Sequence, residues 1–308
     1  MSYPNILVYT VCPFNSTCGG LVVQYELCRI IDNMGINIRM SAPEHVPNNI
    51  FSKYYQNDFD LNNTFVIYGE RIEGNPLNAP YVMRWILAPL GICIYEDIYK
   101  TWGKNDLVYY FNYDQTFLNN EAMIGIKYKV LTSLHINPLI QNYNDPLRKG
   151  YCHTLRKSHY HKTLRYAHHP YSLEIKRDDE FIDCITIFNK CKIFISYDPL
   201  TFLNIMAAMC GCISVVIKVD GITTHSDWLK TTAVSSYTKE NGIEKLYGIA
   251  YGISEIGWAK DTLHLVSQQW IDILEYCKNN TILPFLKDIE DLTNLKNSSN
   301  TIQKIFFE

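Results

Sequence analysis

Residues 195–217 read ISYDPLTFLNIMAAMCGCISVVI, and this stretch is the most informative one for the fold class. An apolar, β-branched run ends just before Asp198-Pro199, helical spacing of apolar residues follows over 201–210, and a second apolar run covers 213–218. Strand, helix and strand in this order are typical of a parallel α/β unit. The sequence therefore predicts a doubly wound parallel sheet around this stretch.

The junction between the first strand and the helix of this stretch is a candidate binding site. Asp198 is a good helix cap and Pro199 suits a first helical position, so we expect the helix to begin directly after the strand. The free N–H groups of that helix start, with Tyr197 and the Thr201 hydroxyl beside them, would suit a diphosphate or a ribose. The same residues are also ordinary helix-start chemistry, so a purely structural role is the alternative.

Two α/β series of this kind are predicted along the chain, joined by a turn-rich segment at 142–150. The first is expected to form a domain over 1–145 and the second a domain over 150–270. We therefore predict two Rossmann-like doubly wound domains that face one another across a cleft, where such folds bind ligands. The predicted strands are 6–10, 36–40, 64–68, 107–111, 127–131, 151–155, 192–196 and 213–218, and the predicted helices are 21–34, 79–87, 179–189, 201–210 and a helical region from 254 onward.

Composition narrows the class of protein. The 308 residues include 28 Lys+Arg and 31 Asp+Glu, which gives a net charge of −3, and this balance argues against a dedicated nucleic-acid binder. The 10 Cys are scattered, several of them in apolar runs, which favours reduced thiols and a cytoplasmic location. No apolar run approaches the roughly 18 residues of a transmembrane helix, and no signal peptide is visible. Peripheral membrane association stays open.

The 195–217 pattern resembles the C-terminal half of the two-Rossmann, or GT-B, glycosyltransferases, of the type that builds cell-surface or viral polysaccharides. In both, an acidic residue follows a strand and opens a helix, which ends in a cysteine-glycine-cysteine-like turn before a Val/Ile strand. Asp198 matches the first of two acidic residues that the family spaces eight apart, whereas Met206 stands at the second position. The resemblance implies transfer of a sugar from a nucleotide-sugar donor to a hydroxyl of a glycan or other acceptor.

The resemblance also implies where the donor and acceptor bind. Arg156 and Lys157 follow the predicted strand 151–155, where the family places a basic pair against the donor diphosphate. His169 is expected to reach the donor, and Gly19-Gly20 opens the first helix as in a glycine-rich loop turned toward both substrates. The donor would lie on 150–270 and the acceptor on 1–145, with the helices of 271–308 packing back on the first domain.

A second group of candidates follows the strand 64–68. Glu70 would lie at the carboxyl end of that strand, where a carboxylate is a plausible general base for an acceptor hydroxyl, and Glu73 and Asn75 are acceptor-side candidates. Downstream, Arg84 and Trp85 are expected on a helix. The alternative is a simple turn that Asn75-Pro76 breaks before that helix.

The sequence lacks the motifs of several other kinds of active site. Five of the nine His crowd into 153–169 beside Cys152, but no C-x-x-C or H-E-x-x-H occurs, so we expect no metal. Neither G-x-G-x-x-G nor G-x-x-x-x-G-K-[ST] is present, which argues against a dinucleotide-dependent dehydrogenase and a P-loop. A G-x-S-x-G nucleophile elbow is also absent. We therefore expect no cofactor beyond the nucleotide-sugar substrate.

Two alternatives to the glycosyltransferase stay open. A sugar-nucleotide epimerase of the same architecture would turn over a donor without any acceptor. A non-catalytic carbohydrate-binding or scaffold protein would bind nucleotide and turn over none, and Met206 at the acidic position favours this alternative.

Overall fold

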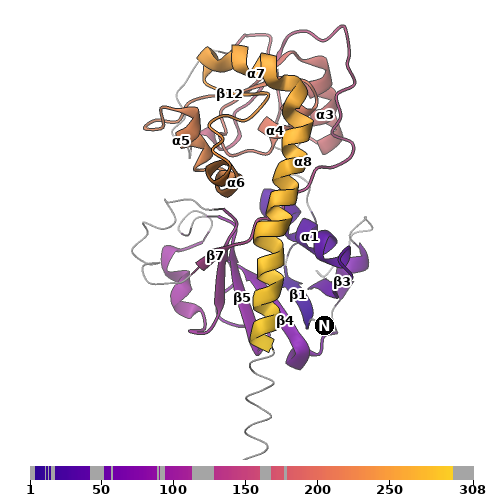
Figure 1. Ribbon diagram of the computed structural model, residues 1–308, viewed down its shortest axis with the longest axis vertical. Coiled ribbons are helices and arrows are strands. Elements are labelled where there is room, and N and C mark those ends of the chain that lie inside the picture. The colour runs from indigo at the N-terminus through magenta and orange to yellow at the C-terminus, as the bar shows by residue number, and fades with distance from the viewer. Residues whose placement is uncertain are drawn as a thin grey trace, which may run out of the picture. The chain divides into compact units, whose positions relative to one another are not determined.

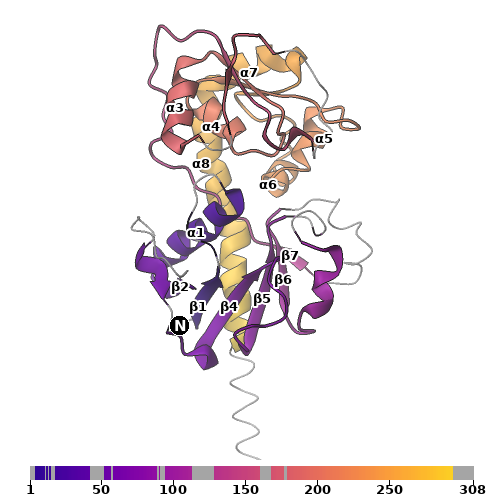
Figure 2. The same cartoon turned by 180° about the vertical axis from the view of Figure 1, so that it is seen from behind.

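The computed structural model describes residues 4–10, 12, 14, 18–41, 52–56, 58–88, 90, 94–112, 128–159, 168–176 and 179–293. It divides into two compact units, the first made of Met1–Leu134 and Tyr276–Glu308 and the second of His135–Glu275. Each unit contains one parallel sheet flanked by helices (Figures 1 and 2). The predicted fold class, α/β with two Rossmann-like sheets, is confirmed.

The first unit has a parallel sheet with the strand order β3-β2-β1-β4-β5-β6-β7. The chain builds outward from β1 to β3 and then crosses to the other side of β1 at β4. The order therefore reverses between β1 and β4, and the helix α1 (Gly19–Asp32) follows β1. The strands are β1 Asn5–Tyr9, β2 Ile38–Ser41, β3 Tyr55–Gln56, β4 Thr64–Gly69, β5 Tyr81–Ile86, β6 Leu107–Tyr110 and β7 Tyr128–Val130, and the 3₁₀ turns are η1 Ser52–Tyr54, η2 Leu61–Asn63 and η3 Glu96–Thr101.

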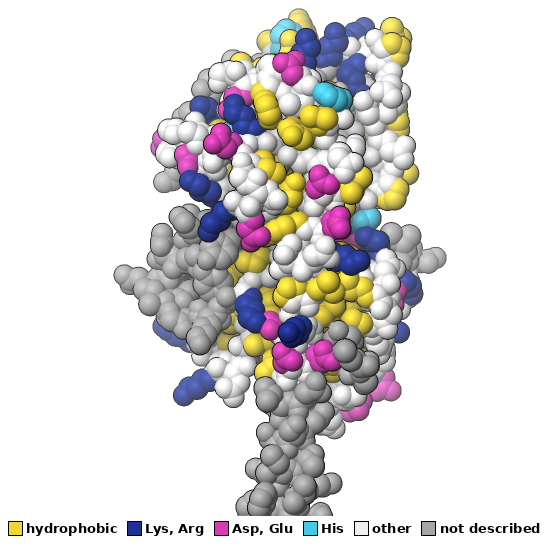
Figure 3. Space-filling model, in the orientation of Figure 1, with side chains coloured by type: hydrophobic (Ala, Val, Ile, Leu, Met, Phe, Trp, Pro, Cys, Tyr) yellow, Lys and Arg dark blue, Asp and Glu magenta, His cyan; other side chains and the backbone are white. Residues whose placement is uncertain are grey.

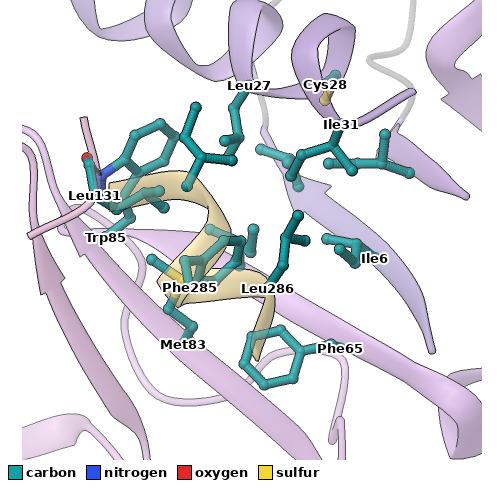
Figure 4. Close-up of a cluster of buried hydrophobic side chains, with 14 of the residues drawn as sticks. Ile6, Leu27, Cys28, Ile31, Phe65, Met83, Trp85, Leu131, Phe285 and Leu286 are labelled. Atoms are coloured by element: carbon teal, nitrogen blue, oxygen red, sulfur yellow. Dashed lines mark hydrogen bonds between the residues drawn. The ribbon is translucent and has the colours of Figure 1, made fainter. Parts of the chain in front are cut away.

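One face of this sheet forms the main core of the first unit. Alternate residues of the strands point to this face, because successive side chains of a strand lie on opposite sides. The chain's last described helix, residues 283–293, continues from α8 (Val266–Cys277) through a π-helical turn at Lys278–Ile282. Its Phe285 and Leu286 lie among side chains of α1 and of the strands (Figure 4), and Lys129 Nζ pairs with Asp288 at 2.6 Å.

The prediction of a helix over 79–87 is wrong, because this stretch is the strand β5. β5 lies between β4 and β6, and Val82 to Ile86 are all buried. A strand that is covered on both faces is apolar nearly throughout, so its period of two is hidden, and periodicity does not distinguish it from a buried helix. Arg84 and Trp85 are therefore strand residues.

The second unit has a parallel sheet with the order β12-β11-β10-β8-β9. β9 pairs with one side of β8, and the chain then crosses to the other side at β10, so the order reverses between β8 and β10. The strands are β8 Tyr151–Thr154, β9 Leu173–Glu174, β10 Ile193–Ser196, β11 Ile213–Val216 and β12 Ile249–Tyr251. Besides α8, the helices are α3 Phe181–Lys190, α4 Leu203–Met209, α5 His225–Leu229, α6 Ser235–Glu240 and α7 Ile256–Thr262, with 3₁₀ turns η5 Arg156–His159, η6 Ile253–Glu255 and η7 Leu263–Leu265.

Arg148 fixes the segment 142–150 to the second unit. Its guanidinium donates to the carbonyl oxygens of Phe188, Cys191 and Cys210, the last at 2.7 Å, and to the side chain of Asn142 at 3.0 Å. These carbonyls end α3 and α4, where the last carbonyls of a helix lack intrahelical donors. Backbone hydrogen bonds add to this contact, from the Lys149 N–H to the Lys190 carbonyl at 2.9 Å and from the Tyr143 N–H to the Asn189 side chain at 2.8 Å, so a segment that reads as a linker is part of the unit.

The charged surface matches the near-neutral composition. On the face drawn in Figure 3, basic and acidic side chains are interspersed among the coloured residues. Among the residues that the structure describes, no helix is long and apolar enough to cross a membrane.

Candidate functional site

The point of strand reversal in the second unit gathers three of the predicted site residues. Arg156 lies two residues after the end of β8. Tyr197 and Asp198 directly follow β10, the strand that pairs with β8. The Tyr197 N–H donates to the Thr154 carbonyl at 3.0 Å, which keeps the two strand ends together. In open α/β sheets, the carboxyl ends at such a reversal are where ligands bind.

The helix predicted over 201–210 is the observed α4, but Asp198 and Pro199 do not form its first turn as the alternative interpretation expects. The helix α4 begins at Leu203, with Phe202 as its N-terminal flanking residue, and the Asp198 carboxylate accepts the Leu200 N–H at 3.2 Å. A short acidic side chain that bonds the backbone two residues on stabilises a turn, which competes with helix formation. Thr201 does the same three residues later, accepting the Leu203 N–H at 3.3 Å. Residues 198–202 are therefore a hydrogen-bonded turn.

Arg156 retains capacity to bind an anion. One terminal nitrogen donates to the Lys176 carbonyl at 3.0 Å, while its Nε is buried without a hydrogen-bond acceptor among the described residues. A guanidinium has five N–H donors, and the bond to Lys176 uses one of them. Lys157 continues the same 3₁₀ turn, and its side chain lies outside the described part of the chain.

The structure places His168, and not His169, beside Tyr197. The His168 ring stacks on His153 at 3.7 Å between ring centroids, and its Nδ1 lies 3.2 Å from the Tyr197 hydroxyl. Burial lowers the pKa of His153, and the neighbouring His168 lowers it further. His169 instead stacks on Tyr151, at the amino end of β8. His161 lies outside the described residues, and the described His, Cys, Asp and Glu include no group of three that could hold a metal ion.

Sequence reasoning missed a buried histidine on the helix that supports the Pro199 turn. His225 Nδ1 lies 2.7 Å from Glu255 Oε2, and its Nε2 accepts the Leu246 N–H at 3.2 Å. On the same helix, Trp228 donates to the Pro199 carbonyl at 3.0 Å and stacks on Tyr251. Because Nε2 accepts a hydrogen bond, the ring is neutral and carries its proton on Nδ1.

The His225 pair predicts acid sensitivity of the fold. Burial lowers the pKa of His225 below its ordinary value of about 6.5. The unfolded chain then binds this proton more readily than the folded chain does. The stability that the neutral His225 contributes is therefore complete above about pH 6.5, and it is lost as the pH falls toward the pKa of His225 in the folded chain. We expect the melting temperature to fall between pH 7.5 and 5.5, and to fall less in His225→Gln. The variant His264→Gln, at an exposed site, should keep the wild-type slope, and equal slopes in all three proteins would contradict the assignment.

In the first unit, Glu70 lies at the strand reversal, one residue beyond β4. Its side chain is 6% exposed, and Oε2 accepts the Leu87 N–H at 3.1 Å at the end of β5. Burial raises the pKa of the carboxyl, against the opposing hydrogen bond from Leu87. A carboxyl group with a raised pKa and a fixed position is suited to accept a proton. Gly19 and Gly20 form the first turn of α1.

Glu73 and Asn75 are held by their own loop. The Asn75 Oδ1 accepts the Tyr68 hydroxyl at 2.9 Å and the Ala79 N–H at 3.0 Å, and its Nδ2 donates to the Ala79 carbonyl at 2.8 Å. Glu73 accepts a hydrogen bond from the Tyr95 hydroxyl. Asn75 therefore shapes the loop that follows Glu70, whereas Glu73 is an exposed carboxylate on it.

The fold and these strand ends define a Rossmann-like α/β protein. No protein-family model matches the chain, and no curated protein matches its sequence. Similar solved structures include a dipicolinate synthase chain from Bacillus halodurans, with 10% identity and a TM-score of 0.24 over 89% of this chain and 99% of that one. NAD⁺-bound 3-phosphoglycerate dehydrogenase from Entamoeba histolytica has 9% identity and a TM-score of 0.24 over 91% and 97% of the two chains.

Proposed function

We propose that the protein is a glycosyltransferase that uses a nucleotide-sugar donor, and that the second unit binds the donor's nucleoside diphosphate. The observation that carries this proposal is the position of Arg156 and of Tyr197-Asp198 just after the neighbouring strands β8 and β10, where the strand order reverses. Arg156 would supply a cation for phosphate at the place where this fold binds nucleotides, and the Asp198 carboxylate, which is 3% exposed, would accept from a ribose hydroxyl there.

The donor's leaving group defines the role of the basic residues. When the bond between the sugar and the diphosphate breaks, negative charge develops on the diphosphate, and Arg156 and Lys157 would stabilise it. The turn at 198–202 would orient the nucleoside, with Tyr197, Asp198, Pro199 and Thr201 along its edge. His169 would contact the donor from the segment before β9.

The acceptor's hydroxyl needs a base. Glu70 of the first unit would fill this role, taking the proton from the acceptor oxygen as that oxygen forms its bond to the sugar. Gly19, Gly20, Glu73 and Asn75 are then the residues around the acceptor. In this step the acceptor oxygen forms its bond to the sugar, the bond between the sugar and the diphosphate breaks, the carboxylate takes the acceptor's proton and the nucleoside diphosphate leaves.

Substitutions at the reversal of the second unit test the donor site. We expect Arg156→Ala and Lys157→Ala each to weaken binding of the preferred nucleoside diphosphate by about 10-fold or more, since a charged hydrogen bond is worth about 1.5–3 kcal/mol. Asp198→Asn keeps an acceptor for the Leu200 N–H and should weaken binding through the loss of charge alone. Calorimetric titration measures each affinity. The exposed Lys260→Ala is the control, and wild-type affinity in all the site variants would place the nucleotide elsewhere.

One observation favours a second candidate, a nucleotide-binding protein without transferase activity. Met206 is 3% exposed and packs in the main core cluster of the second unit, so the helix offers no second carboxylate there. Nucleotide binding with no sugar transfer to any acceptor would select this candidate. Turnover of a donor without an acceptor would instead select the epimerase.

A further inference from the structure

The hydrogen bonds that Asp198 and Thr201 make within the turn at 198–202 are long. The Asp198 carboxylate accepts the Leu200 N–H at 3.2 Å, and the Asp198 carbonyl accepts the Thr201 N–H at 3.4 Å. Ordinary N–H···O bonds in proteins measure about 2.7–3.2 Å, so these two lie at or beyond the long end of that range. Pro199 has no N–H to add a further bond. A contact from another element can therefore decide the position of this turn.

Two contacts from outside the turn are shorter. The Ser196 hydroxyl, at the end of β10, donates to the Asp198 carbonyl at 2.7 Å, and Trp228 Nε1 donates to the Pro199 carbonyl at 3.0 Å. Asn204 Nδ2 reaches the same Pro199 carbonyl only at 3.4 Å. Ser196 precedes the turn directly, whereas Trp228 lies on α5, 29 residues beyond Pro199. Trp228 is 2% exposed, so its bond is shielded from water and ties the turn to a distant part of the second unit.

Trp228 is itself held by Tyr251, the last residue of β12. The two rings stack with 5.5 Å between their centroids and 7° between their planes. The Tyr251 hydroxyl accepts the Val219 N–H and donates to the Ile222 carbonyl, both at 3.0 Å, and so holds the loop after β11. The stacked pair therefore joins the turn after β10, the loop after β11 and the end of β12, which are neighbouring strands of one sheet.

We propose that Trp228 is a positioning residue of the donor site and that it sets the affinity for the nucleoside part of the donor. This inference rests on the proposed function, in which the turn that contains Asp198 would orient the nucleoside. A phenylalanine would stack on Tyr251 in the same way but has no N–H, so the indole supplies the bond to Pro199. The diphosphate, by contrast, would contact Arg156 after β8, outside the turn.

The variant Trp228→Phe removes the N–H and keeps a ring that stacks on Tyr251. In the protein without ligand, we expect the Leu200 amide hydrogen to exchange about 2- to 10-fold faster, the effect of losing one hydrogen bond. Affinity for the preferred nucleoside diphosphate should fall by a similar factor, while affinity for inorganic pyrophosphate stays at the wild-type value. Hydrogen-exchange NMR and calorimetric titration measure these quantities, and a general loss of structure would weaken both ligands alike.

Two other variants serve as controls. Trp258 donates its indole N–H to the Leu246 carbonyl at 3.0 Å in the same unit, so Trp258→Phe should leave Leu200 exchange and both affinities unchanged. Tyr251→Phe keeps the stacked ring and removes the hydroxyl, so it should speed exchange at Val219 and leave Leu200 at the wild-type rate.

Three results would overturn the inference: wild-type exchange at Leu200 in Trp228→Phe, wild-type nucleotide affinity in that variant, or equal losses for nucleotide and pyrophosphate. Faster Leu200 exchange in Tyr251→Phe would also count against it, because Trp228 keeps its N–H there. The exchange rates are measured without ligand, so they decide whether Trp228 holds the turn even if the wild type binds no nucleotide. That outcome would refute the proposed function and the nucleoside role that rests on it.

Discussion

Replacing Arg84 by Met is expected to destabilise the first unit by about 3–5 kcal/mol, as is typical when one partner of a buried ion pair is removed. The Arg84 side chain is 0% exposed and its Nε donates to Asp106 at 2.7 Å. Its terminal nitrogens donate to the carbonyls of Ile72 and Gly74. The guanidinium therefore ties the loop after β4 to the strand β5, and its loss leaves the Asp106 carboxylate and two carbonyls short of donors.

Calorimetric or urea-induced unfolding measures this effect, with Lys100→Met as the matched control. Lys100 also forms an ion pair, with Asp97 at 3.0 Å, but its side chain is 63% exposed. Exposed pairs contribute about 0–1 kcal/mol, so the control should unfold close to the wild type. If the two variants unfold alike, Arg84 does not anchor the loop that carries Glu73 and Asn75.

The second large effect is on catalysis. Glu70→Gln is expected to lower the rate of sugar transfer by about 100-fold or more, since a positioned general base contributes about 10²–10⁴-fold. Nucleotide affinity should stay unchanged, because Glu70 belongs to the first unit and the residues of the proposed donor site belong to the second. Single-turnover transfer and calorimetric titration measure the two quantities separately.

Stability gives an independent check on the same variant. Burial raises the pKa of Glu70, so the folded chain keeps this proton to a higher pH than the unfolded chain does. Charging the carboxyl as the pH rises through that pKa therefore reduces stability, and a neutral glutamine removes this penalty while still accepting the Leu87 N–H. We expect Glu70→Gln to melt at or above the wild-type temperature. A wild-type transfer rate in this variant, with Glu96→Gln as the exposed control, would remove Glu70 as the base.

The strands with clear local patterns could be predicted from the sequence. The strands Thr64–Gly69 and Ile193–Ser196 lie within one residue of their predicted ranges. An apolar, β-branched run between turn residues is typical of a strand, so the sequence pattern defines its limits. The two Rossmann-like sheets follow from the alternation of such strands with helices. The helix predicted at 79–87 failed because β5 is buried on both faces, and the helix start at Pro199 failed because Asp198 and Thr201 bond the turn instead.

The missed residues of the candidate sites have no local signature. His225 is defined by Glu255, 30 residues away, and by the Leu246 N–H, and only the folded chain brings these together. His168 was one of five crowded histidines, and its place beside Tyr197 depends on how the segment before β9 packs on β8.

The most direct test of the donor site is a thermal-shift and calorimetric screen of the wild-type protein against UDP, GDP, CMP, dTDP and their common sugar conjugates, with and without Mg²⁺ or Mn²⁺. A ligand that binds only the folded state raises the melting temperature by mass action. We predict one selective nucleotide class that binds without added metal and loses affinity in Arg156→Ala. No binding across the panel, or binding that Arg156→Ala leaves unchanged, would contradict a donor site at the ends of β8 and β10.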